Sequence, residues 1–551
     1  MPIATQNLRL FRSGPAAVIA RLCDVLKIPQ IIDSVVDWDP VQCRLSPGTR
    51  VKALIINLLV DRQALYHVVD FYRDQDLEVL FGAEQQVRAE ELNDDALGRA
   101  LDKVFATGCL KRIFSTIALT AAATHDVPIE GLHIDTTSIS VQGAYNGEGD
   151  LNITFGFSKD HRPDLKQFVI GLTVTKDGLP ILGQSLGGNT SDKTWYPEVV
   201  EELIQTFSEE KLKEIIFVAD CALVTTANLA LLAPGEDKPG LKFISRLPET
   251  FAVAEEVKTE AFRREWLEIG RLSQKKGAAW YKSQGFVREI DGRSYRLIVV
   301  HSSALDQRKE KNLAKKWAKQ KDELEKAARE LAQRPFACEA DAVKAVEMFI
   351  KERHRQPFTL SSEVTKECVT HYPKPGRPRK GTQPENRPVY HAQVQVSEDQ
   401  EAMAREKDLA STFVLITNVL DAEGHPDREV LQEYKEQNAV ERQFRFLKQP
   451  LLLGPIFLKN KDRVEAMSFV FQLAVLVAAY LEYRVRKSLE AEDAPLVLPG
   501  KRKTTRPTAR ALLEMLDHLL VVKQGPDRAL INYHGPEVVR ALTLAGFGQE
   551  I

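Results

Sequence analysis

The chain has 551 residues and a mass of 61.9 kDa, which at roughly 150 residues per domain predicts about three or four domains. Hydrophobic residues make up 44% and charged residues 28% of the sequence, which excludes global disorder, a collagen and a disulfide scaffold. The 75 Lys and Arg residues nearly balance the 77 Asp and Glu residues, so any nucleic-acid-binding surface must be local.

Cysteine usage and hydropathy both indicate a cytoplasmic protein. The six cysteines lie far apart without a CxxC pair, which argues against a zinc site or a disulfide framework and fits a reducing compartment. The N-terminus lacks the apolar stretch of a secretory signal. The longest apolar run, 468–481, is interrupted by Gln472 and is shorter than the roughly 20 residues that span a bilayer, so it predicts a buried helix.

Residues 1–125 are predicted to form a helical N-terminal domain. Ser46 and Asn93 each precede an apolar-periodic run and are expected to cap helices. Such a bundle can bind DNA as a helix-turn-helix, or serve as a plain scaffold, and the pattern leaves both open.

From residue 126 to residue 247 the sequence pattern changes from helical periodicity to strand-like alternation, which predicts the first part of an α/β core. The segment 131–141 alternates and is β-branched, and Asp177-Gly178 marks a hairpin turn between two further strands. The apolar run 215–219 predicts a strand buried on both faces. The resulting order, β-β-β-α-β-α-β, is typical of a mixed sheet covered by helices.

Residues 248–409 are interpreted as a domain inserted into this core. It contains strand-like stretches, a charged helix at 308–334 and a Pro-, Gly- and basic-rich segment at 372–388 that predicts a surface loop. The apolar stripe of the charged helix consists of Leu313, Trp317, Leu324 and Leu331. A strand at 411–420 then returns to the core, whose second part is assigned to 410–490. A basic segment, 499–510, lies in the predicted C-terminal helical region, 491–551.

Two aspartates stand where apolar residues dominate. Asp135 lies inside the first predicted strand, 131–141. Asp220 comes at the end of the buried strand predicted from the apolar run 215–219. Either one alone is readily explained as a cap of a turn or of the next helix. On adjacent strands of one sheet, however, the two carboxylates can converge, and carboxylate oxygens are the ligands that magnesium prefers.

A third group of polar residues follows helical spacing. If 434–448 is one continuous helix, its polar face carries Tyr434, Gln437, Glu441, Arg445 and Lys448. The neighbouring apolar face, expected to pack on the sheet, consists of Val440, Phe444 and Leu447. This pattern is typical of a solvated amphipathic helix, and equally of a helix beside a phosphate backbone that passes a metal.

These residues resemble the signature of the DDE transposases of bacterial insertion sequences, in the branch with a Tyr-Arg-Glu-Lys helix. The resemblance rests on HIDTTS around Asp135, FVADCAL around Asp220 and the spacing Tyr-x2-Gln-x3-Glu-x6-Lys from Tyr434 to Lys448. Further support comes from GFSKDHRPDLKQFVIGL, the GNTSD at 188–192 and PIFLKNKDRVEAMSFVFQLAVLV. It covers roughly 131–489, apart from the insertion. Gln437 departs from the pattern, which usually has Arg, so its phosphate contact is either missing or taken over by Lys435 or Arg442.

The resemblance implies a ribonuclease-H-like mixed sheet that binds two Mg²⁺ ions, with Mn²⁺ as a substitute. Asp135 would bridge both ions, while Asp220 and Glu441 would each hold one. The implied partners are double-stranded DNA, at terminal inverted repeats and target sites, and further copies of the chain in a homodimer or larger synaptic complex.

The residues expected to bind DNA include several beyond the signature helix. Arg377 and Arg379 resemble an AT-hook in the basic loop, although a flexible solvated loop has the same composition. The remaining DNA-binding candidates are Tyr434, Gln437, Arg445, Lys448, Arg162, Lys166 and Asn189.

The predicted function is a transposase that cuts phosphodiesters at transposon ends and joins the 3′-hydroxyl ends to target DNA. Two alternatives stay open: a non-cutting DNA-binding protein derived from a transposase, and a metal-dependent nuclease without strand transfer. The three carboxylates, Tyr434 and Lys448 argue against a decayed site. The sequence does not separate the nuclease from the transposase.

Overall fold

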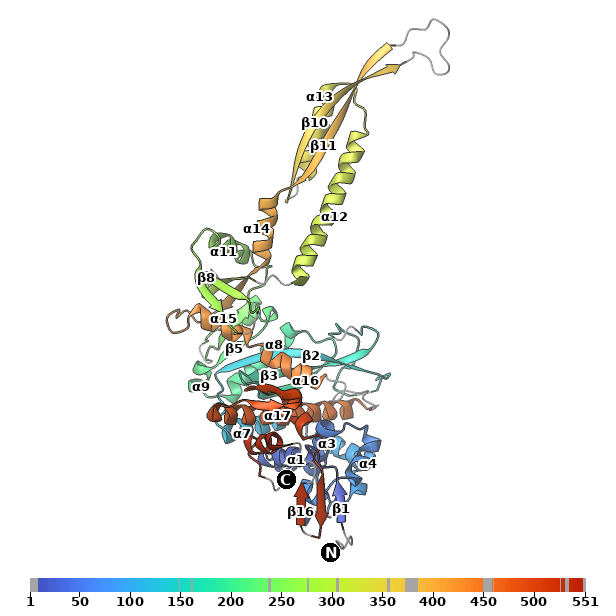
Figure 1. The fold of residues 1–551 in the computed structure, drawn as a ribbon, viewed down its shortest axis with the longest axis vertical. Helices are drawn as coiled ribbons and strands as arrows, with labels where there is room; N and C mark the ends of the chain where they lie inside the picture. The colour runs from blue at the N-terminus through green and yellow to red at the C-terminus, as the bar shows by residue number, and fades with distance from the viewer. Residues whose placement is uncertain are drawn as a thin grey trace. The chain divides into compact units, whose positions relative to one another are not determined.

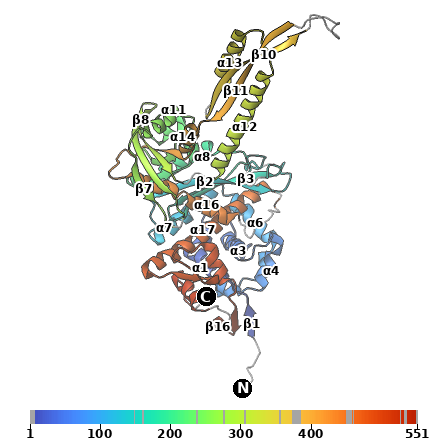
Figure 2. The same ribbon diagram turned by 45° about the horizontal axis from the view of Figure 1, so that its top comes forward.

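The computed structural model describes residues 8–147, 149–159, 162–235, 239–274, 277–303, 307–353, 357–371, 385–448, 458, 460–525, 527–530 and 535–548. The chain forms two compact units (Figures 1 and 2). The first combines residues 1–246 with 417–551, and the second is the continuous stretch 247–416.

The N-terminal part of the first unit is helical after one short strand. Ser46 accepts a hydrogen bond from the Thr49 backbone N–H, and Asn93 accepts one from Ala96, so both predicted helix caps are confirmed. The helices are α1 (Ala16–Val25), α2 (Ile28–Asp33), α3 (Pro47–Val60), α4 (Val68–Arg73), α5 (Leu77–Phe81), α6 (Asp94–Phe105) and α7 (Leu110–Thr124).

The sheet of the first unit follows the predicted order of strands and helices. Its strands are β2 (Gly131–Val141), β3 (Lys166–Thr175), β4 (Pro180–Leu186), β5 (Ile216–Val218) and β6 (Lys242–Arg246), in the spatial order β4-β3-β2-β5-β6. Strands β2, β3 and β4 are antiparallel neighbours, whereas β5 runs parallel to β2 and to β6. The helices between them are α8 (Asp192–Thr206), α9 (Glu209–Glu214) and α10 (Thr226–Leu232). The fold is therefore mixed α/β.

The predicted hairpin turn joins β3 and β4. Gly178 has a φ of +91°, which a residue with a Cβ adopts only with strain, and its N–H donates to the Thr175 carbonyl over 2.8 Å. The Asp-Gly signal was thus a sound indicator of this turn.

Three helices that follow residue 417 complete the core of the first unit. These are α15 (Asp427–Lys435), α16 (Asn438–Leu447) and α17 (Lys461–Glu492). Helix α16 packs on β2 and β3, while α17 packs on β4, α3, α6 and α7 (Figure 1). Helix α17 is long and apolar enough to cross a membrane, but 94% of its most apolar window is buried inside the fold, as predicted for 468–481.

The C-terminal region, predicted to be helical, also contains short strands. Its elements are β13 (Leu496–Leu498), β14 (Arg502–Thr504), α18 (Ala509–Leu516), β15 (Val521–Gln524), β16 (Asp527–Leu530) and α19 (Pro536–Leu544). The predicted basic segment supplies the second strand of the β13–β14 hairpin. Strand β15 pairs with β1 (Leu8–Phe11), a partner more than 500 residues away that local periodicity does not reveal.

The second unit begins with α11 (Ala252–Ala261) and an antiparallel set of strands, β7 (Leu267–Arg271), β8 (Trp280–Ile290) and β9 (Arg293–Ser302). The predicted charged helix is α12 (Gln307–Ala332). The remaining elements are α13 (Glu339–Arg353), β10 (Phe358–His371), β11 (Glu385–Glu398), α14 (Gln400–Ala410) and β12 (Thr412–Thr417).

The C-terminal end of the predicted loop, 372–388, is a strand. Residues 385–388 belong to β11, which pairs with β10 in a two-stranded hairpin, while 372–384 lie outside the described residues. A two-stranded hairpin has only edges, so Pro388 is tolerated there because its missing N–H can face away from the partner strand.

Candidate active site

Asp135 lies within β2, and Asp220 lies two residues beyond the end of the neighbouring parallel strand β5. In the pairing of β2 with β5, His133 faces Val218, and each aspartate follows two residues later. The Asp135 side chain is 23% exposed. Burial raises the pKa of Asp135 to about 6; the charges of Asp192 and Asp220 add to this rise, while Lys159 and the Thr136 N–H oppose it. The two predicted carboxylates are therefore close enough to repel one another.

At each of these two carboxylates, one oxygen atom accepts all the hydrogen bonds. Oδ1 of Asp220 accepts from the Ala222 N–H over 3.0 Å and from the Tyr196 hydroxyl over 2.9 Å. Oδ1 of Asp135 accepts from the Thr136 N–H over 2.8 Å and contacts the Lys159 ammonium at 3.4 Å. Within the described residues neither Oδ2 atom has a hydrogen-bond partner.

The bond from Ala222 shows that Asp220 does cap a short 3-10 turn, Cys221–Leu223, which was the plain alternative for this residue. Capping fixes the side chain without using both oxygens. Ser245 adds a hydrogen bond of 2.7 Å to the Asp220 carbonyl, which holds the backbone at this point. Hydrogen bonds therefore hold Asp220 in one orientation and leave its Oδ2 atom without a partner among the described residues.

Sequence reasoning missed two residues of this cluster, Asp192 and Tyr196 on α8. Asp192 accepts a hydrogen bond from the Thr136 hydroxyl, and its charge reaches Asp135. The Tyr196 side chain is fully buried, and its hydroxyl donates to Asp220. The signal for Asp192 was present in the GNTSD stretch, but nothing local showed that α8 brings it beside β2.

A lysine provides the positive charge in this cluster. The Lys159 ammonium donates to the Thr136 carbonyl over 2.6 Å and lies 3.4 Å from Asp135 Oδ1. We define the Asp135 cluster as Asp135, Asp192, Asp220 and Lys159. It has three carboxylates for one ammonium, and carboxylate oxygens are the type of ligand that magnesium prefers.

The third predicted ligand is not preassembled with the other two. Within the described ranges, no three His, Cys, Asp or Glu side chains converge closely enough to hold a metal ion. Glu441 lies in the first turn of α16 with an exposed side chain. The structure thus brings Asp135 and Asp220 near each other, with Asp192 beside them.

The predicted continuous signature helix is wrong, because the chain forms two helices. Helix α15 ends at Lys435, and α16 begins at Asn438. The Glu436 N–H closes the end of α15 by donating to Gln432 and Glu433, and Ala439 N–H donates to the Glu436 carbonyl over 2.7 Å. The count that placed Tyr434 and Glu441 on one helical face therefore does not hold across this break.

Tyr434 and Glu441 nevertheless lie near each other. Burial raises the pKa of Tyr434 to about 12; the charges of Asp220, Cys221 and Glu441 contribute to the rise, and Arg246 opposes it. Tyr434 therefore lies within electrostatic range of both Asp220 and Glu441. The predicted apolar face of α16 is confirmed, because Val440, Phe444 and Leu447 are buried and the helix packs on β2 and β3.

The two other acidic residues near the end of α15 have a different environment. Glu433 lies 3.3 Å from Nε2 of the fully buried His133 and 3.5 Å from the Lys176 ammonium, which also lies 3.2 Å from Glu436. We call these four residues the Glu433 cluster. His133 and Lys176 lower the pKa of Glu433 against the effect of burial.

The predicted DNA-binding residues occupy several places in the first unit. Arg162 forms an ion pair with Asp164, Lys166 donates to the Ala144 carbonyl, and Asn189 accepts from Asn152 over 3.3 Å. Gln437 lies in the break between α15 and α16, Arg445 is exposed on α16, and Lys448 follows its last turn. Arg377 and Arg379 lie outside the described residues.

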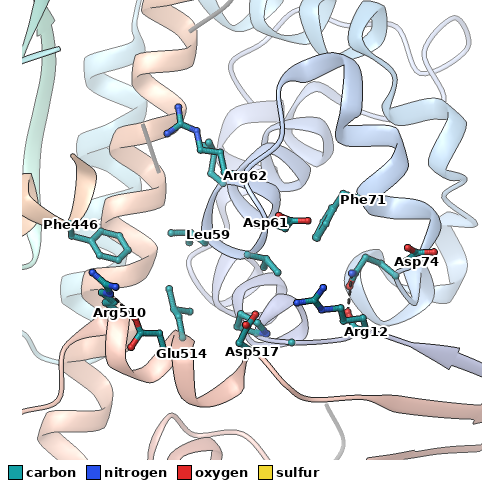
Figure 3. Close-up of a pocket in the computed structure, with 16 residues that line it drawn as sticks. Arg12, Leu59, Asp61, Arg62, Phe71, Asp74, Phe446, Arg510, Glu514 and Asp517 are labelled. Atoms are coloured by element: carbon teal, nitrogen blue, oxygen red, sulfur yellow. Dashed lines mark hydrogen bonds and ion pairs between the residues drawn. The ribbon is translucent and has the colours of Figure 1, made fainter. Parts of the chain in front are cut away.

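A separate cavity of about 460 Å³ is lined by residues of α3, α16 and α18 (Figure 3). Phe446 lines it from α16, Leu59 and Arg62 line it from the end of α3 and just beyond, and Arg510 and Glu514 line it from α18. Arg510 and Glu514 form an ion pair of 2.6 Å across one wall. None of the sequence-predicted site residues lines this cavity, so the aspartates do not belong to it.

Comparisons with known proteins add little to this geometry. Residues 15–119 match the family model described as a domain of unknown function, DUF4277. No curated protein matches the chain. Among solved structures, the chain is similar to the piggyBac transposase in a synaptic complex with hairpin DNA, with a TM-score of 0.36 and 10% identity, over 90% of this chain and 79% of that chain.

Proposed function

We propose that the protein is a transposase of the DDE type, which cuts DNA at the ends of a mobile element and joins the released ends to target DNA. The observation that carries the proposal is the pair formed by Asp135 on β2 and Asp220 just beyond the end of the adjacent parallel strand β5, each with one oxygen held by hydrogen bonds. The residues of the Tyr434 to Lys448 segment, which resemble the transposase signature, lie beside this pair through Tyr434.

Metal ions are part of the proposal. Mg²⁺, or Mn²⁺ in its place, would be held by Asp135 and Asp220, with Glu441 as the third ligand. When bound, two such ions activate the attacking water or 3′-hydroxyl and stabilise the leaving oxygen. The excess of carboxylates over cations in the Asp135 cluster supports this choice of cofactor.

The residues of the chain would have separate tasks. Tyr196 holds Asp220 in one orientation, and Thr136 links Asp192 to β2. Tyr434, whose raised pKa keeps the phenol protonated, can donate a hydrogen bond to a phosphate oxygen. Arg445 and Lys448 would neutralise phosphates along the same strand. The site would work on double-stranded DNA in the bacterial cytoplasm, within a homodimer or a larger synaptic complex.

Cleavage of labelled end DNA in magnesium tests the proposal. We expect Asp135→Ala and Asp220→Ala to eliminate cutting and to retain DNA affinity in a parallel gel-shift, because phosphate contacts spread over many cations supply most of the binding. Undiminished cutting by either variant would contradict the site. Cutting without joining of the 3′ ends would identify the nuclease alternative, and binding without cutting by the wild type would identify the non-cutting one.

The third ligand has its own test. Glu441→Gln should abolish cleavage with little loss of folding stability, because the side chain is exposed and its shape is kept. Glu436→Gln is the matched control, since Glu436 pairs with Lys176 rather than with the aspartates. An active Glu441→Gln protein, or a folded but inactive Glu436→Gln protein, would overturn the assignment of Glu441.

A further inference from the structure

Helix α12 of the second unit carries a row of cations on its outer face. At 100° per residue, Lys311, Lys315, Lys319, Lys326 and Arg329 fall within an arc of about 80°. All five side chains are exposed, and the acidic residue on the same arc is Asp322. We call these five residues the α12 stripe.

The opposite face of α12 packs on its own unit. Leu324 and Leu331 are buried, and α12 lies along β11 and α14 (Figures 1 and 2). The Trp317 indole N–H donates to Glu406 over 2.5 Å. The apolar stripe predicted from the sequence is thus the side that anchors the helix.

The lysines that flank the anchored face are paired with acids. Lys316 lies 3.2 Å from Glu406, and Lys321 lies 2.8 Å from Glu398. On the stripe, by contrast, Lys319 reaches Glu323 only at 4.0 Å. Its other four cations have no ion pair among the described residues.

This arrangement has an energetic cost that a polyanion would relieve. Lys311, Lys315 and Lys319 follow one another at intervals of four residues, and like charges at this spacing destabilise a helix. The second unit also has 32 Lys and Arg residues against 26 Asp and Glu residues, whereas the rest of the chain has 43 against 51. The positive charge is therefore concentrated in this unit.

We propose that the α12 stripe is a binding surface for the phosphate backbone of duplex DNA. From Lys311 to Arg329 the helix rises about 27 Å, at 1.5 Å per residue. A DNA strand presents about eight phosphates over that length, at 3.4 Å each. The inference rests on the proposed function, because it gives the same DNA a second contact outside the active site.

The chemistry of the stripe favours DNA over other anionic partners. A protein partner would require apolar or aromatic residues at the centre of the interface, and the arc offers none. An anionic membrane would require the apolar face of the helix to point outward, but that face is packed on the unit. A regular row of mobile cations is what a phosphate backbone of any sequence binds.

Salt-dependent binding to a labelled duplex of unrelated sequence tests the inference. The full chain carries Asp135→Ala and is kept in EDTA, so that binding is measured without cleavage. The stripe variant combines Lys311→Ala, Lys315→Ala and Lys326→Ala. The control variant removes three exposed cations elsewhere in the unit, through Arg293→Ala, Lys344→Ala and Lys351→Ala.

We expect the stripe variant to lower the slope of log K against log salt by about 2.7, since each phosphate contact contributes about 0.9. The control variant should have the same slope of log K against log salt as the parent protein. Exposed Lys→Ala changes favour helix, so circular dichroism should show both variants folded. A stripe variant that overlays the parent, a control that loses as much, or displacement of the duplex by polyglutamate as readily as by unlabelled DNA would overturn the inference.

The binding result is independent of the fate of the proposed function. Stripe-dependent binding by a protein that never cuts DNA in magnesium would uphold the stripe and reject the transposase. Metal-dependent cutting together with a stripe variant that binds DNA normally would uphold the transposase and reject the stripe as a DNA-binding surface.

Discussion

The Glu433 cluster and the Asp135 cluster each include a residue of β2, and folding shifts the pKa of their central carboxylates in opposite directions. His133 of the Glu433 cluster and Asp135 of the Asp135 cluster are two residues apart on one strand, so both side chains point to the same face. In the first cluster His133 and Lys176 lower the pKa of Glu433 although burial raises it. In the second, burial and two neighbouring carboxylates raise the pKa of Asp135 to about 6.

The difference separates a structural cluster from a candidate site. In the Glu433 cluster, Lys176 lies within ion-pair distance of both carboxylates and His133 lies beside Glu433, so side chains of the cluster itself tie α15 to β2. The Asp135 cluster lacks enough positive charge to balance three carboxylates. A surplus of this kind persists in a folded protein where a cation or a substrate completes the site.

Replacing Glu433 by Gln should test the structural cluster with the largest effect. We expect a loss of about 2 kcal/mol in the free energy of unfolding at pH 7, because the buried His133 imidazole loses its partner and Lys176 keeps only Glu436. The pKa of Glu433 is lowered on folding, so its stabilisation is present above the usual pKa of about 4.5 and is lost as the pH falls through the lowered value.

Urea unfolding at a series of pH values measures this effect. The gap between wild type and Glu433→Gln should close below pH 4.5. Glu429→Gln, at an exposed position on the same helix, is the control and should unfold like wild type. A gap that stays constant with pH would mean that the ion pairs do not stabilise the fold.

Replacing Tyr196 by Phe should weaken the Asp135 cluster more mildly. Loss of the hydroxyl frees Asp220 to rotate, and the apparent affinity for Mg²⁺ in the cleavage reaction should fall by about 10-fold, as for other residues that orient metal ligands. Tyr480→Phe is the matched control, because its buried hydroxyl has no hydrogen-bond partner among the described residues. A Tyr196→Phe enzyme with unchanged magnesium dependence would remove Tyr196 from the site.

Replacing Glu465 by Gln should show that a raised pKa alone does not define the site. Burial, together with Asp150 and Asp462, raises the pKa of Glu465 on α17 to about 7. A raised pKa means that stability falls as the pH rises from about 4.5 to about 7. The variant should therefore be more stable than wild type at pH 8, by about 1 kcal/mol after allowance for its partial exposure.

Thermal unfolding at pH 5 and pH 8 measures this difference, which should be present only at pH 8. Glu490→Gln, exposed on the same helix, should change neither value. DNA cleavage by Glu465→Gln should equal that of the wild type. An inactive but folded Glu465→Gln protein would place a second essential carboxylate outside the Asp135 cluster.

Much of the first unit could be predicted from the sequence because its signals are local. The caps at Ser46 and Asn93, the Asp-Gly turn and the apolar run in α17 each depend on neighbouring residues. The adjacency of Asp135 and Asp220 followed from the order of strands in an α/β sheet. The pairing of β1 with β15 could not be predicted, because it joins the two ends of the chain.

The site was only partly predictable for the same reason. Asp192 and Tyr196 reach the aspartates through the docking of α8, which no spacing along the chain encodes. The break at Glu436 and Gln437 lacks a Pro or Gly, so the sequence predicted one continuous helix across it. Tyr434 is still within electrostatic range of Glu441 across this break.

Direct binding of Mn²⁺ to the DNA-free protein, followed by electron paramagnetic resonance, tests the central claim that the Asp135 cluster holds a divalent ion. We predict saturable binding to the wild type and to Glu433→Gln, and loss of that binding in Asp135→Ala and in Asp220→Ala. Equal binding by all four proteins, or loss in Glu433→Gln alone, would contradict the account.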